Sequence, residues 1–260
     1  MNPIVVVKIG TNLLTTDDRR LDLNNLRELV HQICDELDRN QFNIVVVTSG
    51  AITCGAERVG FTPTTIPEKQ AAAAVGQILL MQEYARFFGG RGRPVGQLLL
   101  TKDGLENAIV VQNTQNTLTH FLKHGVVPIV NENDSVATNE IGPKFGDNDE
   151  LSAVVSRLLG AHRLILLSDI DGVFTDNPKE NQNAILIDHL DSVTEDTFAL
   201  ARDVQNGRSR GGMASKLSAA RDASQSGIEV VIANGRRGGV LAAIQRGDSI
   251  GTKVGASCEK

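Results

Sequence analysis

Two lysine motifs contain the side chains best suited to chemistry in this sequence. Lys8 lies at the end of the apolar run IVVVKI, and Gly10 follows so closely that backbone N–H groups there would approach a ligand. Lys216 lies in GGMASK, where Gly211 and Gly212 precede a predicted helix, and a helix start binds anions such as phosphate. Each motif alone also fits a structural explanation, either a strand-end lysine that reaches solvent or a glycine-rich surface loop.

The segment 131–149 is a third candidate, because carboxylates and amides are dense there. Such side chains bind an ammonium group, a metal ion or both, whereas a solvated acidic loop is the alternative. Two glycines, Gly142 and Gly146, permit a loop that folds back over a substrate. The side chains are Glu132, Asp134, Glu140, Asp147 and Asp149, with Asn131, Asn133, Asn139 and Asn148 among them.

Several well-known chemistries are disfavoured by the motifs that the sequence lacks. It contains no G-x-x-x-x-G-K-[ST], and its near match to G-x-G-x-x-G, starting at Gly90, has Val95 where a third glycine is required. Ser49 in TSGAI lies outside G-x-S-x-G, and DIDGVFTD from Asp169 fails the spacing of a calcium loop. The five histidines are scattered, so acid–base catalysis by histidine is disfavoured too.

Short β-branched runs predict the strands that position these motifs. The runs are unbroken rather than alternating, which is typical of strands covered on both faces. Helical patterns lie between them, at 26–37 and 68–88, and the alternation predicts a three-layer αβα sandwich with a central, mainly parallel sheet. In such α/β folds, ligands bind beyond the carboxyl ends of the strands, where the unusual loops fall. The predicted strands are 4–9, 43–49, 95–100, 126–130, 163–168 and 229–233.

Composition limits the remaining classes of protein. The chain has 260 residues, 41% of them apolar, which suffices for one globular unit. A net charge of −5 and 3% aromatic residues argue against a nucleic-acid partner. Cys34, Cys54 and Cys258 are isolated, which argues against a disulfide framework or a zinc site and predicts reduced thiols in the cytoplasm. No apolar run is long enough for a membrane span or a signal peptide.

Taken in order along the chain, the motifs resemble the amino acid kinase family, from Val5 to about Val254. TSGAI with NENDSVA and GDND is similar to the members of that family that phosphorylate glutamate. The resemblance implies the amino acid kinase fold in a single domain, 1–260, with a glutamate-binding lobe over approximately 1–165 and a nucleotide-binding lobe over 166–260. The motifs are VVKIGTNLLT, VVTSGAI, AAVGQILLMQ, QLLLT, VVPIVNENDSVA, GDNDELSA, LLSDIDGVFT and GGMASKL.

The resemblance also implies a role for each site residue. Lys8 and Lys216 would stabilise charge on the transferring phosphoryl group, and Asp149 would orient both lysines. Asp134 would pair with the α-ammonium group of glutamate. The implied glutamate site comprises Ser49, Asp134 and Asn148. The implied ATP site comprises Lys8, Gly10, Ser168, Asp169, Arg210, Gly211, Gly212, Met213, Ala214, Ser215 and Lys216, and no protein ligand to a metal is implied.

The activity that the resemblance implies is ATP-dependent phosphorylation of the γ-carboxylate of glutamate to γ-glutamyl phosphate, the first step of proline biosynthesis. This carboxylate has a pKa near 4.3 in model peptides, so it is anionic at neutral pH and needs no general base. ATP would be the co-substrate, with Mg²⁺ on its phosphates, and proline would be a feedback inhibitor. The chain would act in the cytoplasm as a dimer or tetramer, without nucleic-acid or membrane partners.

Three departures from the family pattern affect these implications. Ser209 and Arg210 replace the usual Gly-Thr before the glycine pair, and Ser215 replaces a threonine. TDNP at Asp176 replaces the more usual TADP on the nucleotide side. Because the chain stops at Lys260, we also expect no C-terminal PUA domain, an RNA-binding-like module that many relatives carry.

Two alternatives stay open from the sequence. The first is another kinase of the same fold, acting on acetylglutamate, aspartate, carbamate or a nucleoside monophosphate. Asp134 disfavours an acetylated substrate, because an acetylated amine carries no charge to pair with it. The second is a non-catalytic binding or regulatory protein of this fold, and the presence of Lys8, Asp149 and Lys216 argues against it.

Overall fold

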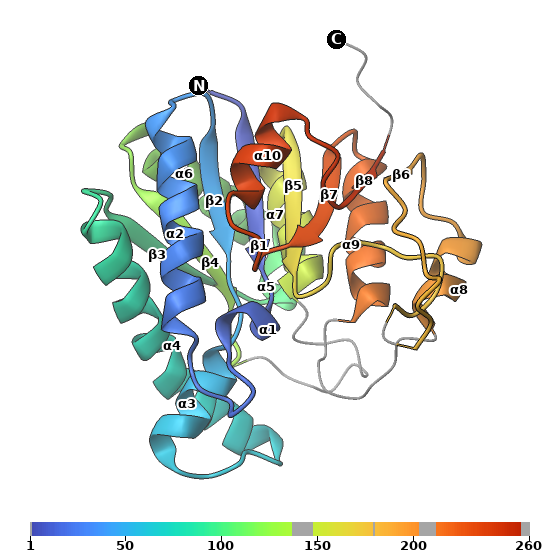
Figure 1. Ribbon diagram of the computed structural model, residues 1–260. Helices are drawn as coiled ribbons and strands as arrows, with labels where there is room; N and C mark the ends of the chain where they lie inside the picture. Colours follow the sequence, from blue (N-terminus) through green and yellow to red (C-terminus); the bar gives the residue numbers. More distant parts are fainter. Residues whose placement is uncertain (1, 137–147, 179, 203–211, 256–260) are drawn as a thin grey trace.

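The computed structural model contains an eight-stranded sheet between two helix layers, within the described residues 2–136, 148–178, 180–202 and 212–255 (Figure 1). In spatial order the strands are β3 (Val95–Leu100), β4 (Val127–Glu132), β2 (Asn43–Val47), β1 (Ile4–Ile9), β5 (Arg163–Ser168), β7 (Glu229–Asn234), β8 (Thr252–Val254) and β6 (His189–Leu190). Neighbouring strands run parallel, except for the antiparallel pair β7 and β8. The mainly parallel sheet predicted from the sequence is confirmed.

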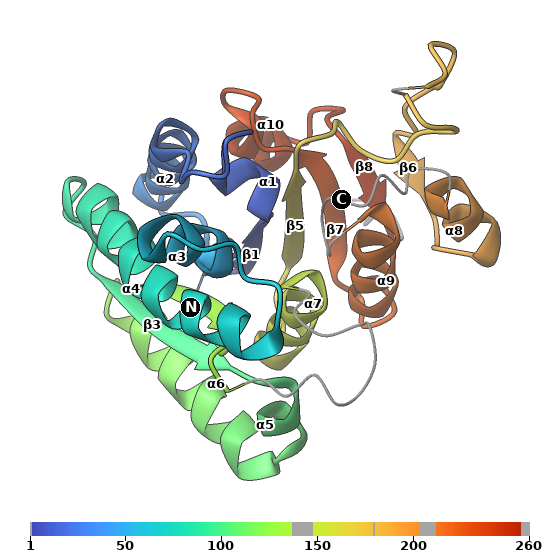
Figure 2. The same ribbon diagram turned by 90° about the horizontal axis from the view of Figure 1, so that it is seen from below.

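Helices cover both faces of this sheet, which confirms the αβα sandwich (Figures 1 and 2). One face packs against α1 (Thr11–Leu14), α2 (Leu23–Asp38), α4 (Ile66–Gly89) and α10 (Val240–Arg246), and the other against α6 (Ala108–Lys123), α7 (Asn148–Leu159) and α9 (Met213–Ser224). Along β1, Val5 and Val7 face the first core and Val6 the second, which explains the unbroken apolar run of this central strand. The other helices are α3 (Ala51–Val59), α5 (Lys102–Glu106) and α8 (Glu195–Arg202).

Strand β3 departs from the prediction that every strand is covered on both faces. It is the last strand at one side of the sheet, and Gln97 and Leu99 are exposed on it. An edge strand has a neighbour on one side only and lies at the rim of the helix layers, so it accommodates polar side chains that a central strand excludes. The run VGQLLL therefore predicts the strand correctly, but it does not predict that the strand is exposed at the edge of the sheet.

The segment 131–149 is not one continuous loop, contrary to the prediction. Its first two residues extend β4, because they pair with the last two residues of β3. Its last two, Asn148 and Asp149, begin α7. Glu132 and Asp149 are thus held by regular structure rather than by a flexible excursion. The candidates Asn139, Glu140, Gly142, Gly146 and Asp147 lie outside the described residues.

Helices α3 and α4 touch through their backbones at two glycines. A Cβ atom on Gly76 would lie 1.8 Å from the carbonyl oxygen of Ala51, and one on Gly55 would lie 1.7 Å from that of Ala72. Both separations are far below van der Waals contact, so only glycine fits at either position. Because α3 starts two residues after Ser49, this contact also fixes the turn that follows β2.

The two described cysteines are isolated, as the sequence predicts. Cys34 and Cys54 are buried and free, and burial raises the pKa of Cys34 to about 11 and that of Cys54 to about 12. Both are therefore neutral, unreactive thiols at physiological pH. Cys258 lies outside the described residues. Within the part of the chain that the structure describes, no helix has the length and apolarity needed to cross a membrane.

Candidate active site

Lys8, Asp149 and Lys216 come together at the carboxyl ends of the strands. The Nζ atom of Lys8 lies 2.5 Å from Oδ1 of Asp149, and Nζ of Lys216 donates a hydrogen bond of 3.0 Å to Oδ2 of the same carboxylate. All three side chains are buried, and Asp149 is wholly inaccessible to solvent. We call these three residues the lysine–aspartate cluster. The structure thus joins the three candidate catalytic residues, which are far apart along the chain.

Three elements of the central fold position the lysine–aspartate cluster. Lys8 lies near the end of β1, between β2 and β5. Asp149 lies in the first turn of α7, where the helix dipole favours a negative charge. Lys216 lies in the first turn of α9, which packs against α7 and begins directly after Gly212, as the glycine-rich motif predicts. A strand end and two helix starts therefore converge on one point.

The charges of the lysine–aspartate cluster sum to +1 when all three groups are ionised. Burial alone would raise the pKa of Asp149, but the charges of Lys216 and Lys8 outweigh this and hold it below its ordinary value. Each carboxylate oxygen contacts one ammonium group, so Asp149 fixes the positions of both lysines. A buried site with one surplus positive charge is suited to an anion such as a phosphoryl group.

Ser49 and Asn148 meet next to the lysine–aspartate cluster. Nδ2 of Asn148 donates a hydrogen bond of 3.3 Å to Oγ of Ser49, and both side chains are buried. Gly50 adopts the left-handed conformation, with φ of 90°, and so turns the chain from β2 into α3. Oδ1 of Asn148 is buried with no hydrogen-bond partner among the described residues. Buried acceptors are normally satisfied, so this oxygen suits a ligand that donates a hydrogen bond.

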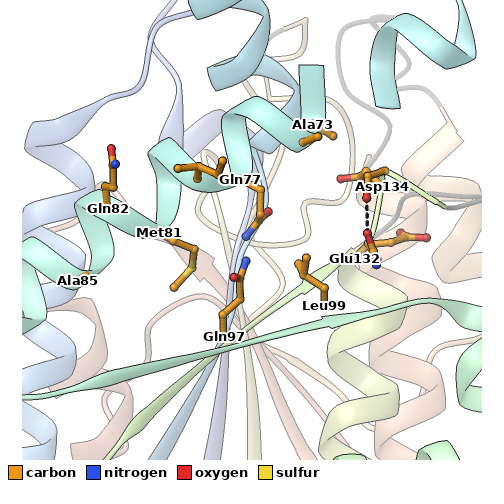
Figure 3. A pocket seen from close by; sticks show the side chains of 13 residues that line it. Ala73, Gln77, Met81, Gln82, Ala85, Gln97, Leu99, Glu132 and Asp134 are labelled. Carbon is orange, nitrogen blue, oxygen red and sulfur yellow. Dashed lines mark hydrogen bonds between the residues drawn. The ribbon is translucent and has the colours of Figure 1, made fainter. Parts of the chain in front are cut away.

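Asp134 lies in a different setting, beside a hollow of about 570 Å³. The hollow is bounded by α4, by β3 and by the residues at and after the end of β4 (Figure 3). Glu132 and Asp134 line one end of it, while Gln77 and Gln97 approach each other from α4 and β3. Two carboxylates in a hollow at the strand ends suit a cationic group such as an ammonium.

Two of the predicted nucleotide residues, Ser168 and Asp169, lie at and just after the end of β5. Oγ of Ser168 donates to Oδ1 of Asp169 at 3.3 Å, and Oδ2 of Asp169 accepts from Nδ2 of Asn12 at 3.2 Å. Gly10 lies beside Lys8, but its N–H group donates to the carbonyl of Leu167 at 3.3 Å. That N–H is therefore engaged within the sheet, contrary to the expectation that it faces a ligand.

The start of α9 supplies the other described part of the predicted nucleotide site. Gly212 caps the helix with φ of −70°, and among the described residues no atom lies within 4 Å of the place where a Cβ would be. Backbone N–H groups at such a helix start favour an anion. Met213 is buried and Ala214 exposed. The candidates Arg210 and Gly211 lie outside the described residues.

Comparison with known proteins identifies the family. A model of the amino acid kinase family matches residues 3–234. The chain belongs to this family. Solved structures agree in fold: UMP kinase from Bacillus anthracis has a TM-score of 0.65 at 18% identity, covering 98% of this chain and 97% of that one. Isopentenyl phosphate kinase from T. acidophilum has a TM-score of 0.67 at 17% identity, covering 96% and 99%. The amino acid kinase fold expected from the sequence is confirmed.

Curated relatives with much higher identity carry the name glutamate 5-kinase. The protein from Clostridium acetobutylicum is 46% identical over 90% of this chain and 87% of its own length. That from Clostridium tetani is 42% identical over 95% of this chain and 92% of its own length. That from Moorella thermoacetica is 45% identical over 95% of this chain, but the chain spans only 65% of the Moorella protein.

Arg236 is an exposed residue beyond the end of β7 that the sequence motifs did not single out. Its Nη2 donates to the backbone oxygen of Asn12 at 2.7 Å, and its Nη1 lies 3.1 Å from Oδ2 of Asp22. It therefore anchors α1, whose Asn12 contacts Asp169. The run NGRR directly follows a predicted strand, so the rule that ligands lie beyond strand ends would have pointed to it.

Proposed function

We propose that this member of the amino acid kinase family transfers the γ-phosphoryl group of ATP to the γ-carboxylate of glutamate, in the first step of proline biosynthesis. The observation that carries the proposal is the buried lysine–aspartate cluster, whose charges sum to +1, beside the Ser49 and Asn148 contact. The relatives named glutamate 5-kinase, at 42–46% identity, support glutamate as the acceptor.

The two substrates meet at the lysine–aspartate cluster. In this proposal, residues of approximately 1–165 bind glutamate and residues 166–260 bind the nucleotide. Ser49 and Asn148 hold the substrate beside the cluster, and Asp134 pairs with its α-ammonium group. The ATP-binding side of the site is lined by Ser168, Asp169 and the start of α9. The position of the cluster between β1 and α9 supports this division.

The transfer itself needs no proton donor or acceptor from the protein. An oxygen of the γ-carboxylate, already anionic, forms a bond to the γ-phosphorus while the bond from that phosphorus to the bridging oxygen breaks. The electron pair stays on the leaving oxygen, so the products are γ-glutamyl phosphate and ADP. Lys8 and Lys216 offset the repulsion between the two anions, and Asp149 keeps both ammonium groups in place.

The lysine–aspartate cluster is suited to bind the phosphates of ATP, but not to bind Mg²⁺ directly. The surplus positive charge of the lysine–aspartate cluster suits a phosphate group. Each oxygen of Asp149 already contacts an ammonium group, and the described residues contain no cluster of three or more His, Cys, Asp or Glu side chains that would hold a metal. Mg²⁺ would therefore be carried mainly by the phosphates of ATP, where it neutralises charge on the leaving group.

The proposal extends to regulation, assembly and location. Proline, the end product of the pathway, would act as a feedback inhibitor by competing for the glutamate site. The chain would work as a homodimer or homotetramer in the cytoplasm. Its acidic net charge of −5 supports the absence of a nucleic-acid partner.

Trapping of the product with hydroxylamine tests the proposed function. With glutamate, ATP and Mg²⁺, we expect γ-glutamyl hydroxamate to accumulate, because hydroxylamine captures an acyl phosphate before water does. Omission of ATP or Mg²⁺ should abolish the signal. N-acetylglutamate is the informative competitor, because it has no α-ammonium group for Asp134. Equal or faster reaction with N-acetylglutamate would rule out glutamate as the substrate.

A further inference from the structure

Two buried amide side chains link β4 to α4 beside the hollow. The backbone N–H of Glu132 donates to Oδ1 of Asn131 at 2.9 Å, and Nδ2 of Asn131 donates to Oε1 of Gln77 at 2.8 Å. Asn131 is 1% exposed and Gln77 8% exposed. The backbone donor therefore decides the orientation of both side chains. Because Oδ1 of Asn131 must accept, its Nδ2 must donate, and the atom of Gln77 that meets it must be the oxygen.

With the side chains oriented in this way, the amide nitrogen of Gln77 is a donor without an acceptor among the described residues. Nε2 of Gln77 is buried and has no hydrogen-bond partner among the described residues. Buried polar groups are nearly always paired, so an unmatched one at a cavity wall indicates a ligand that accepts a hydrogen bond. Figure 3 shows the side chain of Gln77 reaching from α4 into the hollow toward Gln97. The same hollow is lined by the carboxylates of Glu132 and Asp134.

A donor amide on one wall and carboxylates at one end match the two charged groups of an α-amino acid. We propose that Gln77 is a substrate-binding residue whose Nε2 donates to the α-carboxylate of the amino-acid substrate, while Asp134 binds its α-ammonium group. The inference rests on the proposed function, because it orients the same substrate with its γ-carboxylate toward the lysine–aspartate cluster. Gln77 would thus select for substrates that carry an α-carboxylate.

Gln77→Glu is the most direct test of this inference. Glutamate at position 77 keeps an oxygen for Nδ2 of Asn131 but turns the donor into an acceptor, with a negative charge that repels a carboxylate. When this variant is assayed at pH 8, we expect its KM for glutamate to be about 10- to 100-fold higher than that of the wild type. This is the loss expected when a hydrogen bond to a charged group is removed, and the KM for ATP should not change. Gln77→Met, which removes the donor without adding charge, should change the KM for glutamate in the same direction.

The matched control is Gln112→Glu on α6, outside the hollow. It adds the same charge at an exposed position and leaves the Asn131 to Gln77 hydrogen bond intact, so the KM for glutamate should change by less than threefold. A second comparison uses 4-aminobutyrate, which is glutamate without its α-carboxylate, as an inhibitor of glutamate turnover. Gln77→Glu should not weaken its inhibition, because Gln77 has no group to bind in that molecule.

Two results would overturn the role of Gln77. One is a KM for glutamate in Gln77→Glu equal to that of the wild type. The other is an equal weakening of glutamate and 4-aminobutyrate, because that would report a general disturbance of the hollow rather than a lost contact with the α-carboxylate. Failure of the proposed function has a separate signature, since the wild-type chain would then form no γ-glutamyl hydroxamate at all.

Discussion

Lys216→Ala is expected to lower kcat by about 100- to 1000-fold, the usual loss when one group that stabilises a developing charge is removed. Removal of this ammonium group leaves Lys8 and Asp149, whose charges cancel, so the buried cluster changes from +1 to neutral. The phosphoryl group then loses the surplus positive charge that offsets its repulsion with the γ-carboxylate. The rate of hydroxamate formation at saturating glutamate and ATP measures this loss directly.

Two further variants separate charge from packing in this experiment. Lys216→Met fills most of the same volume without a charge, so it should be about as inactive as Lys216→Ala while keeping the thermal midpoint of the wild type more closely. Lys102→Ala removes a lysine from an exposed ion pair with Glu150, one residue after Asp149, and should leave kcat unchanged. Full turnover by Lys216→Met would show that this charge has no part in the transfer.

Gly76→Ala is expected to destabilise the chain by about 3 kcal/mol or more, because overpacking alone costs about 1–3 kcal/mol and here the obstacle is backbone. The new Cβ would lie 1.8 Å from the carbonyl oxygen of Ala51 and 2.4 Å from the backbone nitrogen of Gly55. Neither atom belongs to a side chain that can rotate away, so α3 and α4 must separate. We expect the thermal midpoint to fall by roughly 6–12 °C at the usual slope for domains of this size.

The same helix offers a matched control for Gly76. Gly89 is the last residue of α4, and no atom of the described residues lies within 4 Å of a Cβ built there, so Gly89→Ala should be neutral or slightly stabilising. Since α3 starts two residues after Ser49, Gly76→Ala should also raise the KM for glutamate more than the KM for ATP. A Gly76→Ala protein with the thermal midpoint of the wild type would show that the two helices are not held at this distance in solution.

Local pattern was enough to predict the strands that lie within long apolar runs. β1, β3 and β5 occupy the predicted ranges, because apolar residues are concentrated in each of them. β6 and β8 have two and three residues, which is too short for any period to be visible, and they owe their pairing to β7 and to each other. Exposure of β3 was not predictable either, since it depends on the strand order and not on the run itself.

Some of the candidate site residues could be predicted from local sequence, whereas others are evident only in the folded structure. Local sequence was enough to single out Lys8, at a strand end, and Lys216, at a glycine-rich helix start. The prediction that Asp149 contacts both lysines came from the family resemblance. Nothing in the helical stretch that contains Gln77 marks its amide as different from the others. Its orientation is set by Asn131, a residue on a strand that only the folded sheet brings near.

The central position of β1 has a consequence for the order in which the chain assembles. β1 is synthesised before the other strands of this sheet, yet it pairs with β5, which is complete only at Ser168. At typical synthesis rates of 5–20 residues per second, one edge of β1 waits roughly 8–30 s for its partner. During that interval a strand with three consecutive valines has an open hydrogen-bonding edge, so nascent chains should be most vulnerable to mispairing before residue 168 emerges. The strand that carries Lys8 is therefore central in the finished sheet and is also the strand that waits longest, during synthesis, for a partner.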